Sequence, residues 1–148
     1  MQAFTYCQKV KSVDLTTLDL SNVSSAYYAF SGCNALEEII GFAAPGDSSM
    51  SKPFPIGTSS SHCALRRLVF ADVPAGKYAV KASFSIAHDS FGQDGMVEMF
   101  NSLPDVSKSG LAASKRQITI TGNPCVTDGT LTDADRAIAT SKGWTLVE

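Results

Sequence analysis

The sequence predicts an α/β fold in which repeated units stack into a solenoid, each unit supplying one short parallel strand and one helix. The main observation is a register that repeats after 26 residues: Phe4, Cys7, Val10 and Val13 are matched by Phe30, Cys33, Leu36 and Ile39. The register then resumes after an insertion, with an offset of 29: His62, Leu65 and Leu68. Such a self-match is typical of repeat proteins, whose units bury their apolar faces against their neighbours.

Each unit of the N-terminal half is expected to hold one strand. Polar and apolar residues alternate at 12–15, and the matching positions predict strands ending near Ile39 and covering 68–70. Helices are expected at 1–7 and 21–33, where apolar residues lie three or four apart. Residues 42–61 contain three prolines among many serines and glycines, which predicts a loop insertion, either functional or simply tolerated.

The C-terminal half is expected to continue the pattern. A strand is predicted at 78–86, after a turn at 74–77, and a helix with Met96, Met99 and Phe100 inward is expected to end before Pro104. The stretch 116–121 is a further strand. Thr132 and Asp135 have capping-box spacing ahead of the last helix. A final strand is expected to pair Trp144 and Leu146 with Ile118 and Ile120, again 26 residues away.

Length and composition limit the functional classes. The 148 residues are interpreted as a single domain, 1–148, and the net charge of −2 argues against nucleic-acid binding, which needs a basic face. No apolar stretch is long enough for a membrane helix, and no signal peptide is recognised in this chain. Because the chain begins within a repeat unit, we expect it to be a fragment of a longer protein.

The chemically reactive residues form no recognisable catalytic or metal-binding motif. Cys7 and Cys33 occupy the same inward position in successive units and are expected to be buried free thiols. His62 is interpreted as a core substitute for that cysteine. The run 88–90 holds the three residue types of a catalytic triad, but consecutive residues cannot supply its geometry. The aspartates at 128, 133 and 135 lack calcium-loop spacing. No catalytic residue, metal or cofactor is therefore expected.

Two stretches carry a family resemblance. The run 18–24 (LDLSNVS), followed by Ala29, Phe30, Cys33 and Leu36, resembles the BspA-type leucine-rich repeat, found in surface proteins of gut and oral bacteria and in related phage tail proteins. Residues 99–106 also resemble this family, and residues 131–146 are similar to its closing unit. The chain departs from the pattern at Tyr27 and His62. The resemblance implies a leucine-rich-repeat solenoid and an extracellular, cell-surface or virion location.

The resemblance also implies a non-enzymatic binding or adhesion module that recognises a host protein or glycan. The alternation of side chains along each strand then assigns the binding residues to the exposed sheet face. These candidates are Ser12, Asp14, Glu38, Arg67, Ser83, Ser85, Gln117 and Thr119. The alternative is a structural spacer or assembly segment of a bacterial or phage fibre protein. The chain would be a monomer in the first case and fibre-associated in the second.

Overall fold

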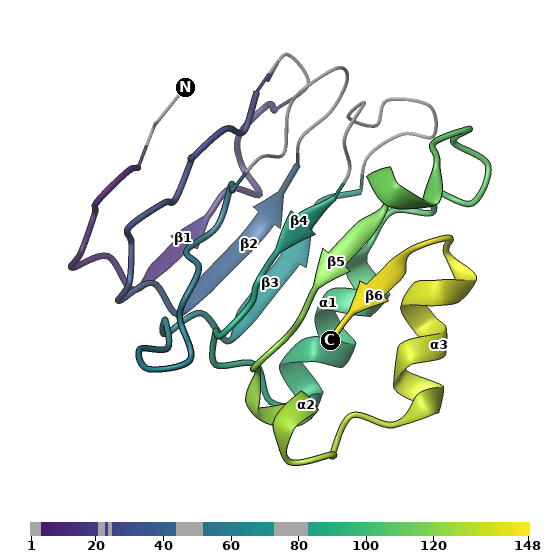
Figure 1. Cartoon of the computed structure of the whole chain (residues 1–148). Helices are drawn as coiled ribbons and strands as arrows, with labels where there is room; N and C mark the ends of the chain where they lie inside the picture. Colours follow the sequence, from purple (N-terminus) through teal and green to yellow (C-terminus); the bar gives the residue numbers. More distant parts are fainter. Residues whose placement is uncertain (1–3, 21–22, 24, 44–51, 73–82) are drawn as a thin grey trace.

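The computed structural model describes residues 4–20, 23, 25–43, 52–72 and 83–148, which form an α/β structure with two three-stranded parallel sheets (Figure 1). The first sheet, in strand order, contains β1 (Ser12–Asp14), β2 (Glu38–Phe42) and β3 (Arg67–Phe70). The second contains β4 (Phe84–Ser85), β5 (Gln117–Thr119) and β6 (Thr145–Val147). Between the strands of the second sheet lie α1 (Gln93–Ser102), the 3₁₀ turn η1 (Ala113–Lys115), α2 (Pro124–Thr127) and α3 (Asp133–Ser141).

Strand pairing in the first sheet follows the predicted register. Val13 pairs with Ile39, and Ile39 pairs with Leu68, so the offsets of 26 and 29 are both confirmed. Ile39 and Leu68 are fully buried. Gly41, at a φ of 75°, interrupts the register after Ile40, and the chain then pairs Phe42 with Phe70. A bulge of this kind redirects a side chain, and here Phe42 joins the core.

The prediction of one helix in each unit is wrong for the N-terminal half. Residues 4–9 and 26–35 form turns, and no helix occurs among the described residues from 4 to 43. Tyr6 and Tyr28 have positive φ angles, which a right-handed helix does not allow. The physical reason lies in the repeated apolar positions, which start at Phe4 and Phe30 and recur strictly every third residue. Tight turns of the 3₁₀ type repeat every three residues, whereas an α-helix has 3.6 residues per turn.

The continuous solenoid is also contradicted, because the chain reverses direction between the two sheets. The arrows of β2 and β5 point in opposite directions (Figure 1). The rings of Phe70, at the end of β3, and Phe84, at the start of β4, lie 5.4 Å apart. Beyond the other end of β4, Ser90 N donates to Leu65 O ahead of β3 at 2.8 Å. β3 and β4 therefore run antiparallel without sharing a sheet, and a leucine-rich-repeat solenoid does not describe this fold.

The second sheet is built from two strand–helix–strand crossovers. Phe84 pairs with Ile118, and Ile118 pairs with Leu146, so the predicted partner of Ile118, Trp144, is wrong by two residues. Trp144 instead lies just before β6, where it is buried and its indole Nε1 donates to Pro104 O at 2.9 Å. The turn at 74–77 and residues 78–82 of the strand expected at 78–86 lie outside the described residues.

Helix α1 joins the two halves by packing along β3. Its inward residues Met96, Met99 and Phe100 are fully buried, as predicted. At Gly95 the helix backbone approaches Arg66 so closely that a Cβ would lie 2.3 Å from the Arg66 carbonyl oxygen. At the last residue of the helix, Ser102 Oγ accepts the Phe70 backbone N–H at 3.0 Å. The helix thereby covers an edge strand whose backbone groups would otherwise be open to pairing.

Helix α3 begins with the predicted capping box, in which Thr132 Oγ1 and the Asp135 carboxylate accept each other's backbone N–H. The sequence spacing predicts Leu131, Ala134, Ala137 and Ile138 on its inward face. Ala134 and Ala137 are instead exposed, and Ala139 is buried. At its end, Lys142 Nζ donates to three carbonyl oxygens at the C-terminus of α1, at 2.6 to 3.0 Å. A cation at this position satisfies carbonyls that have no partner within the helix.

A chain of aromatic rings connects the cores of the two sheets. Phe42, Phe54, Phe70 and Phe84 contact one another with centroid distances between 4.8 and 6.5 Å. Phe54, only 1% exposed, belongs to the predicted loop insertion at 42–61. The described end of that loop, 52–61, therefore contributes to the core. A loop prediction based on proline, serine and glycine content could not detect this single buried ring.

Candidate functional site

The eight residues predicted to form the binding face are divided between the two sheets. Ser12, Glu38 and Arg67 lie in one row across β1, β2 and β3, because the strand register pairs them directly. Asp14 begins the next row. Ser85 and Thr119 pair on the second sheet, where Gln117 pairs with Thr145. Since β3 and β4 belong to different sheets, the eight residues do not form one continuous ladder.

Arg67 is held by helix α1. Its Nε and Nη2 atoms donate to the two carboxylate oxygens of Glu98 at 2.9 and 2.7 Å. Hydrogen bonds from Arg67 lower the pKa of Glu98, and hydrogen bonding to Glu98 raises the pKa of Arg67. Such a bidentate pair fixes the guanidinium plane. Arg67 therefore presents one side of its side chain to solvent while its charge is shared with α1.

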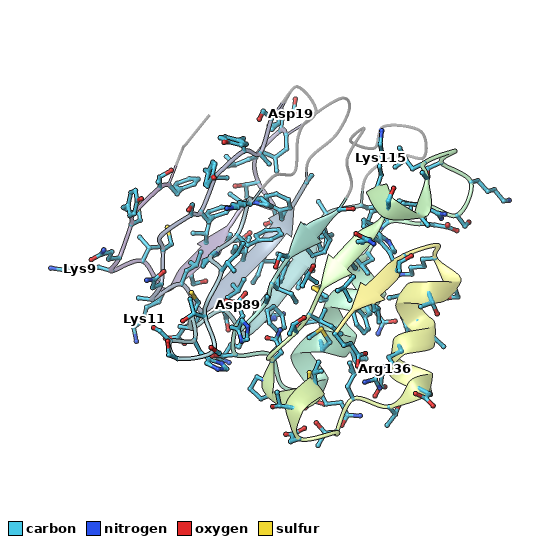
Figure 2. The ribbon with its side chains drawn as sticks, viewed as in Figure 1. Lys9, Lys11, Asp19, Asp89, Lys115 and Arg136 are labelled. Carbon is cyan, nitrogen blue, oxygen red and sulfur yellow. The ribbon has the colours of Figure 1, made fainter. Side chains whose placement is uncertain are left out.

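The charges beside this row alternate in sign. One carboxylate oxygen of Glu37 lies 3.2 Å from Lys11 Nζ, and the other lies 3.3 Å from Arg66 Nη2. Arg66 Nη2 also lies 3.5 Å from a carboxylate oxygen of Glu38. Hydrogen bonds from Lys11 and then Arg66 lower the pKa of Glu37. Figure 2 shows Lys11 pointing away from the body of the molecule. We name the following set the charged strip: Lys11, Asp14, Glu37, Glu38, Arg66 and Arg67.

The charged strip contributes little to stability and so is free to serve recognition. Lys11 and Arg66 side chains are 75% and 55% exposed. Exposed ion pairs of this kind typically contribute about 0–1 kcal/mol to folding. Asp14 is exposed too, and its carboxylate accepts both the hydroxyl and the backbone N–H of Thr16, which lowers its pKa. It therefore stays ionised at neutral pH. A partner can replace these weak contacts with its own charges at low cost.

The predicted residues of the second sheet have structural hydrogen bonds instead. Ser83 Oγ accepts the Gln117 backbone N–H at 2.8 Å, which links the start of β5 to the residue before β4. Ser85 Oγ accepts the Ala87 backbone N–H at 3.2 Å in the turn that follows β4. Ser83, Ser85, Gln117 and Thr119 are all half-buried. Two of these four side chains, Ser83 and Ser85, are thus engaged with the backbone, whereas the charged strip includes the exposed residues Lys11, Asp14 and Arg66.

A second group of polar residues gathers where the segment before β3 meets the turn after β4. It contains His62, Cys63, His88 and Asp89, and the two histidine rings lie 5.9 Å apart. Cys63, and not His62, occupies the buried position, since His62 is exposed. The Cys63 thiol donates to Asn34 Oδ1 at 3.6 Å. Figure 2 shows Asp89 within the body of the molecule, among the side chains below β4.

Asp89 is the most unusual member of this group. It is fully buried, and neither carboxylate oxygen has a hydrogen-bond partner in the part of the chain that the structure describes. Burial raises the pKa of Asp89 to about 8, although the nearby Cys63 thiol opposes the shift. Isolated buried charge is so costly that the carboxyl group keeps its proton at neutral pH. The polar sequence around Asp89 predicts that Asp89 or Ser90 caps the helix that follows. Gly92 instead occupies the N-cap of α1, and nothing in the local sequence indicates the burial of Asp89.

Two members of this group, Asp89 and Cys63, are protonated and uncharged at neutral pH. Burial raises the pKa of Cys63 to about 11, so its thiolate, the nucleophilic form, is scarce at neutral pH. His62 Nδ1 contacts the backbone oxygen of Asp89 at 3.2 Å and not a side-chain hydroxyl or thiol. No group of three potential metal ligands occurs among the described residues. All four cysteines are free thiols.

An apolar cavity of about 270 Å³ lies at the end of the first sheet nearest the ends of β1 and β2. Its described lining includes Phe4, Leu15, Leu18, Phe30 and Phe42. Among the lining side chains only Ser25 is polar. The cavity has no charged group that could orient a ligand.

Comparisons with known proteins give no relative for this chain. No protein-family model, curated protein or solved structure matches it. Within the described residues, no helix is long and apolar enough to cross a membrane. The functional argument therefore depends on the geometry of the chain itself.

Proposed function

We propose that this chain is a non-enzymatic binding module that recognises a protein partner through the charged strip. The observation that carries the proposal is the registered row Ser12–Glu38–Arg67 on three consecutive strands, each strand being preceded directly by a charge, with alternating sign across the sheet (Lys11, Glu37, Arg66). Charges fixed on a rigid sheet give orientation and specificity to an encounter more than they give stability to the fold. The resemblance of 18–24 and 29–36 to BspA-type repeats supports the same class of function, displayed on a cell surface or virion.

Charge reversal on the strip tests this proposal. The double variant Asp14→Lys with Glu38→Lys changes two side chains without removing buried contacts, and we expect it to reduce partner affinity about tenfold or more. A matched control is Asp105→Lys with Asp128→Lys, which reverses two exposed aspartates of the second half. Wild type and both variants are immobilised, and extracts of cells that contain candidate partner proteins are passed over each of them. The proteins retained are quantified at low and high salt.

The supporting result is a protein that binds wild type and the control in a salt-dependent manner but is lost by the strip variant. Its affinity is then measured with the purified protein. A partner that binds all three forms equally would show that the strip is only a solvated surface. Circular dichroism establishes that each variant is folded.

The alternative function, an assembly segment of a fibre, is favoured by one observation. β1 and β6 are end strands, each pairing with a single neighbour among the described strands. Unpaired strand edges can join to other chains. Light scattering across a dilution series distinguishes the two functions, because an oligomer that persists on dilution supports assembly and a monomer supports recognition.

A further inference from the structure

Three tyrosines lie on the two turns at 4–9 and 26–35. Tyr6 is 71% exposed and Tyr27 is 42% exposed, the largest exposures of any aromatic side chain described. Tyr28 is half-buried and contacts Tyr27 edge-on at a centroid distance of 4.2 Å. The turns stack directly, since Tyr6 N donates to Ser31 O and Thr5 Oγ1 donates to Tyr28 O. Figure 1 shows both turns on the side of the first sheet away from the helices. We name Tyr6, Tyr27 and Tyr28 the tyrosine surface.

The backbone holds Tyr6 in place at a conformational cost. Its φ is 60°, a left-handed conformation that is unfavourable for a bulky residue. The ring lies directly over Gly32, where an added Cβ would be 2.4 Å from Tyr6 Cδ1. Because most of the ring remains exposed, burial does not offset the strained backbone. The same left-handed conformation recurs at Gly32, 26 residues later, and Tyr6 N donates to Ser31 O, so the stacked turns themselves hold the ring in this exposed position.

The chemistry around the tyrosine surface is polar and nearly uncharged. The neighbouring turn residues Gln8, Ser31 and Asn34 offer hydroxyl and amide groups, and Gln8 and Asn34 are exposed. Lys52 Nζ lies 6.0 Å from the Tyr28 ring centroid, and Lys9 projects outward from the first turn (Figure 2). The described turns at 4–9 and 26–35 contain no carboxylate. Flat rings surrounded by neutral hydrogen-bonding groups differ clearly from the charged strip.

We propose that the tyrosine surface is a binding site for a neutral glycan. The C–H face of a pyranose ring packs against the exposed face of an aromatic ring, while tyrosine hydroxyls and the neighbouring amides bond sugar hydroxyls. The size of the surface favours a sugar over a protein. Aromatic side chains bury about 150–250 Å² each when fully covered, whereas a stable protein interface needs about 800 Å² on each side. Tyr6 on the first turn and the contacting pair Tyr27–Tyr28 on the second offer an aromatic area that matches one or a few sugar rings.

This site is separate from the charged strip, so the two proposals fail independently. The test uses affinity electrophoresis of the intact chain in gels containing one soluble neutral polysaccharide each: a β-glucan, a galactomannan, a xylan and a hydroxyethyl chitin. We expect at least one to retard wild type. Tyr6→Ala and Tyr27→Ala should each weaken that retardation about tenfold, and Tyr6→Phe should retain most of it because the ring face remains.

The Gly32→Ala variant adds a geometric test. Its new methyl group displaces the Tyr6 ring without changing any tyrosine, so retardation should fall as in Tyr6→Ala. The variant Asp105→Lys with Asp128→Lys, at exposed aspartates of the second half, is the matched control and should bind the polysaccharide as wild type does. Should a tyrosine variant fail to fold, NMR titration of the wild-type chain with oligosaccharides of the retarding polysaccharide decides. Shifts confined to 4–9 and 26–35 support the site.

Any one of the following results would overturn the proposal. The first is no retardation of wild type by any of the four polysaccharides. The second is retardation that Tyr6→Ala leaves unchanged, or NMR shifts that fall on the strands. A protein partner that is lost in Tyr6→Ala but not in the strip variant would also overturn it, because the tyrosines would then recognise a protein surface.

Discussion

Asp89→Asn is expected to make stability less dependent on pH and to raise it at neutral and alkaline pH. The carboxyl group is fully buried with no hydrogen-bond partner found for either oxygen among the described residues, and burial raises its pKa from the ordinary value of 3.8 to about 8. Between these two values the folded chain keeps a proton that the unfolded chain has lost. The folded state therefore binds more protons, so stability must fall as pH rises through this window.

The size of the effect follows from the same two values. Each unit of pH between about 4 and 8 lowers the free energy of unfolding by about 1.4 kcal/mol. At pH 7 the accumulated loss is about 4 kcal/mol relative to a side chain that never ionises. An asparagine has nearly the same shape and no charge to lose. Its amide needs acceptors of its own, which makes about 4 kcal/mol an upper limit for the gain at pH 7.

The assay is urea unfolding at pH 5, 6, 7 and 8, followed by the fluorescence of Trp144, the only tryptophan. The difference in stability between the variant and wild type should grow by about 4 kcal/mol from pH 5 to pH 8. The control is Asp128→Asn, at an exposed carboxylate whose pKa is lowered by hydrogen bonds from Thr130 and which titrates below this range. Parallel curves for Asp89→Asn and wild type would refute the reasoning, as would an Asp89 carboxyl ¹³C signal that titrates near pH 4.

Three further changes test the packing. Gly95→Ala should lower the free energy of unfolding by about 1–3 kcal/mol, because the new Cβ meets the Arg66 carbonyl oxygen; Gly92→Ala, which meets nothing within 4 Å, should cost less than about 1 kcal/mol in the same urea titration. Lys142→Met should cost about 1.5–3 kcal/mol, since three carbonyl oxygens at the end of α1 lose a charged donor, and hydrogen exchange should rise in the last turn of α1. Asn123→Ala removes a buried amide that makes three hydrogen bonds with the backbone, and should cost about 2–3 kcal/mol or more; a melting temperature unchanged from wild type would contradict the assigned contacts.

The strands of the first half could be predicted because the sequence positions of a few inward residues determine their register. Val13, Ile39 and Leu68 each need a neighbour at the same level of a parallel sheet, and the offsets of 26 and 29 express that need directly. The helices predicted for the same half failed because a spacing of three suits tight turns as well as one face of a short helix. Only the left-handed residues Tyr6 and Tyr28 decide between them, and neither residue type indicates a positive φ.

The reversal of the chain could not be predicted, because strand direction depends on contacts that a local pattern does not encode. Phe70 and Phe84 meet across the two sheets, but each alone has the pattern of an ordinary core residue. Candidate site residues were affected in the same way. The exposed positions of β1 to β3 follow from alternation, whereas the pairing of Arg67 with Glu98 depends on where α1 docks. The burial of Asp89 depends on the same long-range arrangement.

Because α1 docks on β3, a further strand can be added to the first sheet at only one of its two edges. Ser102 occupies a backbone N–H of Phe70, and Gly95 lets the helix lie too close to β3 for another strand to enter. Strand addition to this sheet is thus blocked at β3, and β1 is left as the edge where another chain could pair. Any variant that loosens α1 would open the second edge. Such variants are therefore expected to aggregate in proportion to their loss of helix docking, and not simply to unfold.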